Sequence, residues 1–214
     1  MSQVAISGNA SGTGTLTIAA PNTNSNYTLT LPTATTTFVG TDATQTLTNK
    51  TIQGGAITSG TAVASTSGTS IDFTSIPSWV KRITVMFSGV SLSGTSAFLL
   101  QLGTSSGVET SGYLSYGAYS GGTNIAGGSS STAGFIIFSN QSPNLFYGQA
   151  VFTSLGSNIW IGSHVLGLNA TGSPYSVHGG GNKTTASTLD RVRITTVNGT
   201  DTFDAGSINI MYEG

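Results

Sequence analysis

Charged residues are scarce in this chain of 214 residues, where Lys, Arg, Asp and Glu together make up 6%. An average globular domain has roughly 25%. Helix surfaces are normally built from Glu, Lys, Arg, Gln and Ala, so the shortage argues against helices. The formal net charge of -1 offers nucleic acid or an anionic membrane little electrostatic attraction. We therefore expect neither nucleic acid nor a membrane as a partner.

Cysteine is absent, which excludes disulfide bonds and thiolate metal ligands. No apolar run approaches the roughly 18 residues that a membrane-spanning helix needs. The opening MSQVAISGNASGTG has neither the basic start nor the apolar stretch of a secretory signal. We expect a protein that is made in the cytoplasm and is not secreted.

Glycine, serine and threonine are abundant instead. Threonine packs well on a pleated surface and can remain solvated, so a chain rich in threonine and poor in charge favours β structure. The predicted fold class is all-β: an antiparallel β-sandwich or jelly roll, preceded by a short β-rich N-terminal anchor segment.

Residues 1–57 form the predicted anchor or stalk. Apolar residues alternate with polar ones in TLTIA (15–19), YTLTL (27–31) and TTFVG (36–40), a pattern typical of strands with one buried face. Pro21 and NTNSN (22–26) predict the first turn. Such strands bury too little surface to fold alone, so they need a partner surface from another copy or another protein. The apolar positions are Leu16, Ile18, Leu29 and Leu31.

Residues 58–214 form the predicted β-sandwich domain, in which the aromatic residues are concentrated. The Gly- and Ser-rich stretches YSGGTNIAGGSSSTA and NATGSPYSVHGGGNKTTAS are interpreted as loops, and IPSWV (76–80) as a tight turn that places Trp79 over one end of the core. Many short strands without intervening helices indicate a sandwich or jelly roll. The predicted strands are 61–65, 70–73, 81–90, 97–102, 113–119, 134–138, 146–154, 159–168, 190–195 and 207–212.

Two fragments match catalytic motifs. GTSSG (103–107) fits the G-x-S-x-G elbow, and HGGG (178–181) fits a lipase-type oxyanion element. No helical pattern follows Gly107, HGGG stands on the wrong side of the serine, and no later histidine remains as a base. We therefore expect a protein that is not an enzyme and predict no catalytic residues. The least favoured alternative is a cell-wall or glycan hydrolase, which needs two carboxylates across a cleft, and the seven scattered acids offer no recognisable pair.

Metal and cofactor sites are likewise not predicted. The histidines His164 and His178 are separated by a loop. Asp201 and Asp204 in NGTDTFDAG either bind calcium or stabilise a turn through their own backbone, and the turn is the preferred interpretation. In RVRIT the residues Arg191 and Arg193 alternate with apolar residues, so they lie on the face opposite the core, as a solvated face or a contact between subunits.

The chain resembles bacteriophage virion appendage proteins. The N-terminal part ends in the recurrent TLTNKTI element of that group, here Thr46–Ile52, and IDFTSIPSWVKRITVMFSGVSLSG and RVRITTVNGTDTFDAGSINIMYEG resemble terminal β-sandwich domains of tail-fibre and head-fibre proteins. The resemblance implies a homotrimer located in the virion. A long repetitive shaft and the H-x-H repeats of some fibre tips are absent. Leu47 and Ile52 of the TLTNKTI region join the predicted assembly residues.

The resulting expectation is a non-enzymatic capsid decoration or head-fibre protein, anchored to the major capsid protein or to a tail or collar protein. The alternative is a receptor-binding tail fibre that recognises a host surface polysaccharide. Under that alternative, aromatic faces would stack on sugars. The candidate glycan contacts are Tyr113, Tyr116, Tyr119 and Tyr175.

Overall fold

The computed structural model describes residues 11–14, 22–26, 57–121, 124–138, 144–170 and 173–214. Among these residues every regular element is a β-strand, and the strands form two antiparallel sheets. The predicted all-β class is confirmed, and the arrangement is consistent with a β-sandwich. The chain divides into two compact units, Met1–Thr48 and Asn49–Gly214. The predicted strands at 15–19, 27–31 and 36–40 lie outside the described residues.

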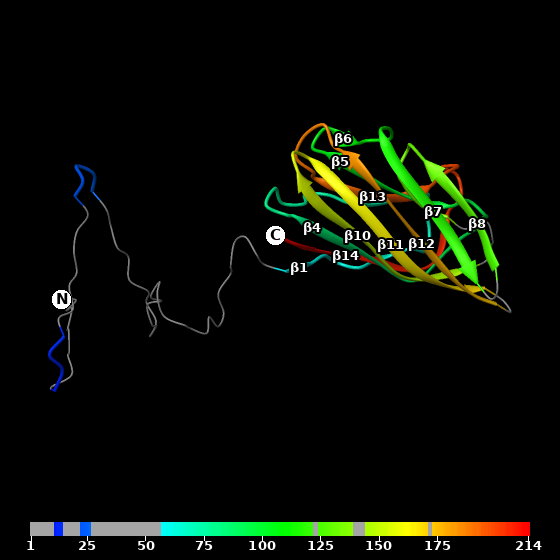
Figure 1. The fold of residues 1–214 in the computed structure, drawn as a ribbon, viewed down its shortest axis with the longest axis horizontal. Helices are drawn as coiled ribbons and strands as arrows, with labels where there is room; N and C mark the ends of the chain where they lie inside the picture. The colour runs from blue at the N-terminus through cyan, green and yellow to red at the C-terminus, as the bar shows by residue number, and fades with distance from the viewer. Residues whose placement is uncertain (1–10, 15–21, 27–56, 122–123, 139–143, 171–172) are drawn as a thin grey trace. The chain divides into compact units, whose positions relative to one another are not determined.

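The large sheet has nine strands in the order β1-β14-β4-β10-β11-β12-β7-β8, with β2 also paired to β14. Figure 1 shows β4, β10, β11, β12, β7 and β8 side by side, so this sheet presents one broad face. The strands are β1 (Thr58–Ser59), β2 (Val63–Ala64), β4 (Arg82–Leu92), β7 (Tyr113–Gly121), β8 (Asn124–Ser131), β10 (Leu145–Gly156), β11 (Ile159–Ala170), β12 (Ser173–Thr184) and β14 (Phe203–Glu213).

The small sheet has five strands in the order β3-β13-β5-β6, with β9 also paired to β5. The strand β5 is buried along its whole length, because Phe98, Leu100 and Leu102 enter the main core and Leu99 packs with Ala97 and Ile136 in a second small cluster. The strands are β3 (Ile71–Phe73), β5 (Phe98–Thr104), β6 (Gly107–Val108), β9 (Phe135–Ile137) and β13 (Arg191–Thr196).

One continuous hydrophobic core lies between the two sheets. Phe98 of β5 meets Phe146 of β10 edge to face, with ring centroids 4.9 Å apart, a geometry that adds attraction to the burial itself. The remaining core residues occupy the inward-facing positions of strands in which buried and exposed residues alternate. In β13, for example, Val192 and Ile194 are fully buried. The predicted alternation of RVRIT is therefore confirmed, with both arginines on the outer side.

The predicted turn in IPSWV is also confirmed. The N–H of Val80 donates to the carbonyl of Pro77 at 3.1 Å, and Trp79 packs half-buried against the core beside Tyr212. Next to it, a pocket of about 160 Å³ lies between this turn and the β10–β11 turn. Lys81 is the one side chain carrying a formal charge in the pocket lining.

The interpretation of two Gly- and Ser-rich stretches as loops was wrong. The first contains β8. The second contains β12, a twelve-residue strand that pairs with β11 on one side and with β7 on the other. Composition misled here because glycine in a strand has a packing role that a propensity scale does not record. A Cβ at Gly179 or Gly181 would clash with the backbone carbonyl of Tyr116 or Leu114 on β7. Glycine therefore permits the close approach of β12 to β7.

Candidate interaction surface

The outward side of β10, β11, β12 and β7 is the candidate site. Along β7 and β11 every second residue is buried in the core, and the residues between them face away from it. We call this side the uncharged face. Its apolar members are Leu114, Tyr116, Tyr147, Ile161 and Val165, and its polar members are Gln149, Ser163, His178 and Asn182, all of them exposed.

The strand registers bring these residues into rows across the sheet. Val165 lies between His178 of β12 and Gln149 of β10. In the next row Ser163 and Tyr116 flank Gly180, which has no side chain. Asn182 then separates Ile161 from Leu114. Directly opposed side chains on a sheet lie about 5 Å apart, so the uncharged face is one surface rather than a set of isolated residues.

Charge is scarce on the five neighbouring strands at one side of the large sheet. The strands β8, β7, β12, β11 and β10 contain one Lys, Arg, Asp or Glu among them, and this residue, Lys183, is buried. The outer side of the small sheet carries a bidentate pair of Arg193 with Asp72 at 2.7 Å. A second pair joins Arg191 to Asp190 at 2.7 Å. Ion pairs therefore lie on the small sheet and, through Arg82 and Glu213 at 3.1 Å, on the β4–β14 part of the large sheet, whereas the uncharged face lacks any charge that a partner would have to desolvate.

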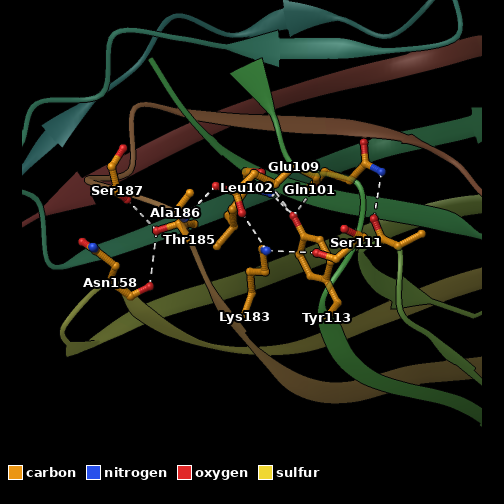
Figure 2. A network of polar contacts seen from close by, with 11 residues as sticks. Gln101, Leu102, Glu109, Ser111, Tyr113, Asn158, Lys183, Thr185, Ala186 and Ser187 are labelled. Carbon is orange, nitrogen blue, oxygen red and sulfur yellow. Dashed lines mark hydrogen bonds and ion pairs between the residues drawn. The ribbon is translucent and has the colours of Figure 1, made fainter. Parts of the chain in front are cut away.

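A polar network lies inside the domain, on the core side of the uncharged face (Figure 2). The Lys183 ammonium donates to the carbonyl of Ser111 at 2.9 Å, lies 2.6 Å from Oε2 of Glu109 and sits 5.1 Å from the centre of the Tyr113 ring. The other carboxylate oxygen of Glu109 accepts the N–H of Ala186 at 2.8 Å. Because Glu109 directly follows β6, these contacts tie β12 of the large sheet to the small sheet.

Tyr113 completes the connection between the sheets. Its hydroxyl accepts the N–H of Leu102 at 2.8 Å and lies within hydrogen-bond distance of the carbonyls of Leu102 and Glu109. Burial raises the pKa of Tyr113 well above its usual range, with the neighbouring Glu109 adding to the rise. The phenol therefore remains a neutral donor that bridges β7 and β5.

His164 of β11 points the other way, into the interior beneath the uncharged face. It is 6% exposed, and its Nε2 atom finds no hydrogen-bond partner among the described residues. Burial lowers the pKa of His164 to about 4, and electrostatic interaction with His178 contributes in the same direction. At neutral pH the imidazole is uncharged and packs close to Gly179.

The tyrosines predicted to contact glycans are placed very differently from one another. Tyr113 and Tyr119 are 1% and 5% exposed, so neither ring offers a face to a sugar and these two assignments were wrong. An even number of positions separates Tyr113 from Tyr119, so both side chains point to the core side of β7. Tyr175 packs half-buried against Tyr119, with ring centroids 5.7 Å apart. Tyr116 is 65% exposed, and its contact with a glycan stays a prediction.

The predicted assembly residues Leu16, Ile18, Leu29, Leu31, Leu47 and Ile52 all lie outside the described residues. Sequence reasoning missed Val165, Ile161 and Leu114 on the uncharged face. A signal was available: the predicted strands 113–119 and 159–168 that contain them have no Lys, Arg, Asp or Glu, so charge could not mark their solvent side.

The motif-like fragments take part in regular structure. GTSSG forms the end of β5, a two-residue turn and the start of β6, so Ser105 lies in a hairpin and not on an elbow before a helix. His178 of HGGG faces outward, and Gly179 and Gly181 pack against β7.

Asn198, rather than Asp201 or Asp204, makes the side-chain bonds to its own turn that the sequence predicted. Oδ1 of Asn198 accepts the backbone N–H groups of Thr200 and Asp201, and the Asp201 carboxylate accepts from the N–H of Ser96 at 2.9 Å. Asp204 accepts a hydrogen bond from the hydroxyl of Ser91. Each aspartate thus bonds to a neighbouring segment of the protein.

Comparison of the chain with protein-family models, with curated proteins and with solved structures finds no significant match. Within the described part of the chain, no helix has the length and apolar character needed to cross a membrane.

Proposed function

We propose that this chain is a non-enzymatic structural protein of a bacteriophage virion. It is a homotrimeric capsid decoration or head-fibre protein, anchored by residues 1–57 to the major capsid protein or to a tail or collar protein. Its domain of residues 58–214, with jelly-roll topology, is displayed outward. The single observation that carries the proposal is the uncharged face, because a broad outward sheet surface without charges suits permanent contact with protein.

The N-terminal segment supports the same conclusion from the sequence. The TLTNKTI element and the alternating strands before it resemble phage appendage proteins, and one-sided strands of this length require a surface on which to bury their apolar residues. Three copies around an axis provide such a surface.

A second candidate function is host recognition by a receptor-binding tail fibre. The observation that favours it is the exposed ring of Tyr116, which stands beside the side-chain-free position of Gly180 and near Asn182 and His178. An aromatic ring with amide and imidazole groups close by is a suitable platform for a sugar, which would stack on the ring and form hydrogen bonds at its edge.

The test of the proposed function is the place and number of copies in the parent particle. A cryo-EM map is expected to show trimers distributed over the capsid with the N-terminus docked on capsid subunits. A handful of copies at the tail, together with inhibition of phage adsorption by the purified protein, would establish the second candidate instead. Complete absence from the particle would refute both.

The anchor is tested separately by replacing Leu47 and Ile52 with serine. We expect the double variant to lose trimer assembly or attachment to the particle, because both residues bury apolar surface in the proposed anchor. The matched control replaces the nearby polar residues Gln45 and Gln53 with serine. An unaffected trimer that still docks would show that the TLTNKTI region is only a spacer.

A further inference from the structure

We infer that the uncharged face is the surface through which copies of this chain contact one another. The inference rests on the proposed function in one respect, namely that the protein assembles as several copies. It goes beyond that proposal by assigning the contact to β10, β11, β12 and β7, in addition to the N-terminal segment.

The first step concerns charge. A partner that covers this face has no charge to neutralise, since Lys183 is buried beneath it, the strands β10, β11, β12, β7 and β8 carry no other Lys, Arg, Asp or Glu, and Arg82 on the flanking β4 is paired with Glu213. A charged partner surface would lose its water without gaining an ion pair in return. The surface that matches an uncharged face is another uncharged face, and an identical copy supplies one. The net charge of -1 also leaves two copies almost without long-range repulsion.

The second step concerns the side chains. Val165 is 64% exposed and Ile161 is 42% exposed on the same strand, in positions where a sheet facing water normally has polar residues. Single exposed apolar residues are common on protein surfaces. Here Val165, Tyr116 and the pair Ile161 and Leu114 occupy three successive rows, with polar residues or glycine between them, so four exposed apolar side chains share one face.

The third step separates a second copy from a sugar as the occupant. A glycan would use the ring of Tyr116 and the amide of Asn182. It would gain little from Val165 and Ile161, because an aliphatic side chain offers neither a ring for stacking nor a hydrogen bond. Another sheet face covers aliphatic and aromatic residues alike. Val165 and Ile161, which lie on β11 within the face, therefore favour a protein partner over a sugar.

The absence of cysteine from the chain allows a direct test in the full-length protein. Val165→Cys places a single thiol on the uncharged face. Val197→Cys places one after β13 of the small sheet, at a valine that is similarly exposed, 55% against 64%. The rate of maleimide labelling is measured for both variants, at a concentration where light scattering reports an oligomer and again after dilution to the monomer. Circular dichroism verifies that both variants fold.

We expect the thiol at position 165 to react at least about tenfold more slowly than the thiol at position 197 in the oligomer, and at a similar rate in the monomer. Labelling detects the contact even if the N-terminal segments alone hold the oligomer together. As a second measurement, Val165→Lys should weaken assembly, with Val197→Lys as the unchanged control, because the new ammonium would be buried at the contact.

Four outcomes would overturn the inference. Equal labelling rates in a confirmed oligomer would place the contact elsewhere and leave the proposed homotrimer standing. A monomer at every concentration would contradict both the inference and the homotrimer. Protection of position 165 within a monomer would mean that another part of the same chain covers the face. Equal rates combined with polysaccharide binding that Tyr116→Ala abolishes would assign the face to a glycan.

Discussion

The ammonium of Lys183 lies 2.6 Å from Oε2 of Glu109, and the two side chains are only 8% and 20% exposed. This pair connects β12, at the centre of the uncharged face, to the small sheet on the other side of the core. Removing one partner of a buried pair leaves a charge without compensation, so the relationship has a measurable consequence for stability.

Lys183→Met is expected to lower the free energy of unfolding by about 3 kcal/mol, because it leaves Glu109 charged and unpaired in a largely buried position. The measurement is urea unfolding of the full chain. The control is Arg193→Met, which breaks a pair that is 36% exposed on both sides and should cost less than about 1 kcal/mol. Equal losses in the two variants would show that burial of the Lys183 pair has no energetic importance.

Tyr113→Phe is expected to cost about 1–3 kcal/mol of unfolding free energy, because the buried N–H of Leu102 loses its acceptor. The matched control is Tyr116→Phe on the same strand, whose hydroxyl belongs to an exposed ring, and its effect should stay within about 0.5 kcal/mol. If the two variants unfold at the same urea concentration, the Tyr113 hydroxyl does not stabilise the contact between β7 and β5.

Gly181→Ala is expected to destabilise the domain by about 1–3 kcal/mol, since the added methyl group meets the backbone carbonyl of Leu114 and forces β12 away from β7. Gly180→Ala is the control one residue away. There the new Cβ faces outward, and its nearest neighbour is the Gly162 carbonyl at 3.1 Å. Thermal unfolding of both variants provides the comparison, and a larger loss for Gly180→Ala would contradict the packing role given to Gly181.

The stability of the domain should fall in acid because of His164. Burial lowers the pKa of His164 from 6.5 to about 4. Between these two values the unfolded chain binds a proton that the folded chain does not, so stability is complete above pH 6.5 and declines as the pH falls toward 4. The expected loss from this group is on the order of 3 kcal/mol, at 1.36 kcal/mol for each pKa unit.

The pH prediction is measured by urea unfolding from about pH 7 to about pH 4.5. The carboxylates contribute to the same profile, so the comparison is between variants. His164→Gln should flatten the decline relative to the parent, whereas His178→Gln on the exposed side of β12 should retain most of it. A parent and a His164→Gln variant with the same slope would disprove the assignment to His164.

Much of the fold was predictable because the relevant signals are local. The alternation in RVRIT correctly placed Val192 and Ile194 inside and the arginines outside, since successive side chains of any strand point to opposite faces. The turn in IPSWV was predictable because proline restricts its own backbone. By contrast, β12 was taken for a loop, because its glycines pack against Tyr116 and Leu114 of β7, residues more than sixty positions away in the chain.

The candidate site was likewise predictable from the sequence only in part. Composition alone established a β-rich chain with hardly any charge, and the residues themselves show that β7, β10 and β11 contain no Lys, Arg, Asp or Glu. The sequence did not show which tyrosines face water. Tyr113 and Tyr116 have the same chemistry, and they are distinguished only because the Tyr113 side of β7 packs against Phe135 and the core. The pairing of strands distant in sequence brought Tyr116, Val165 and Ile161 onto one face, since strand order and register arise from contacts between segments and not within them.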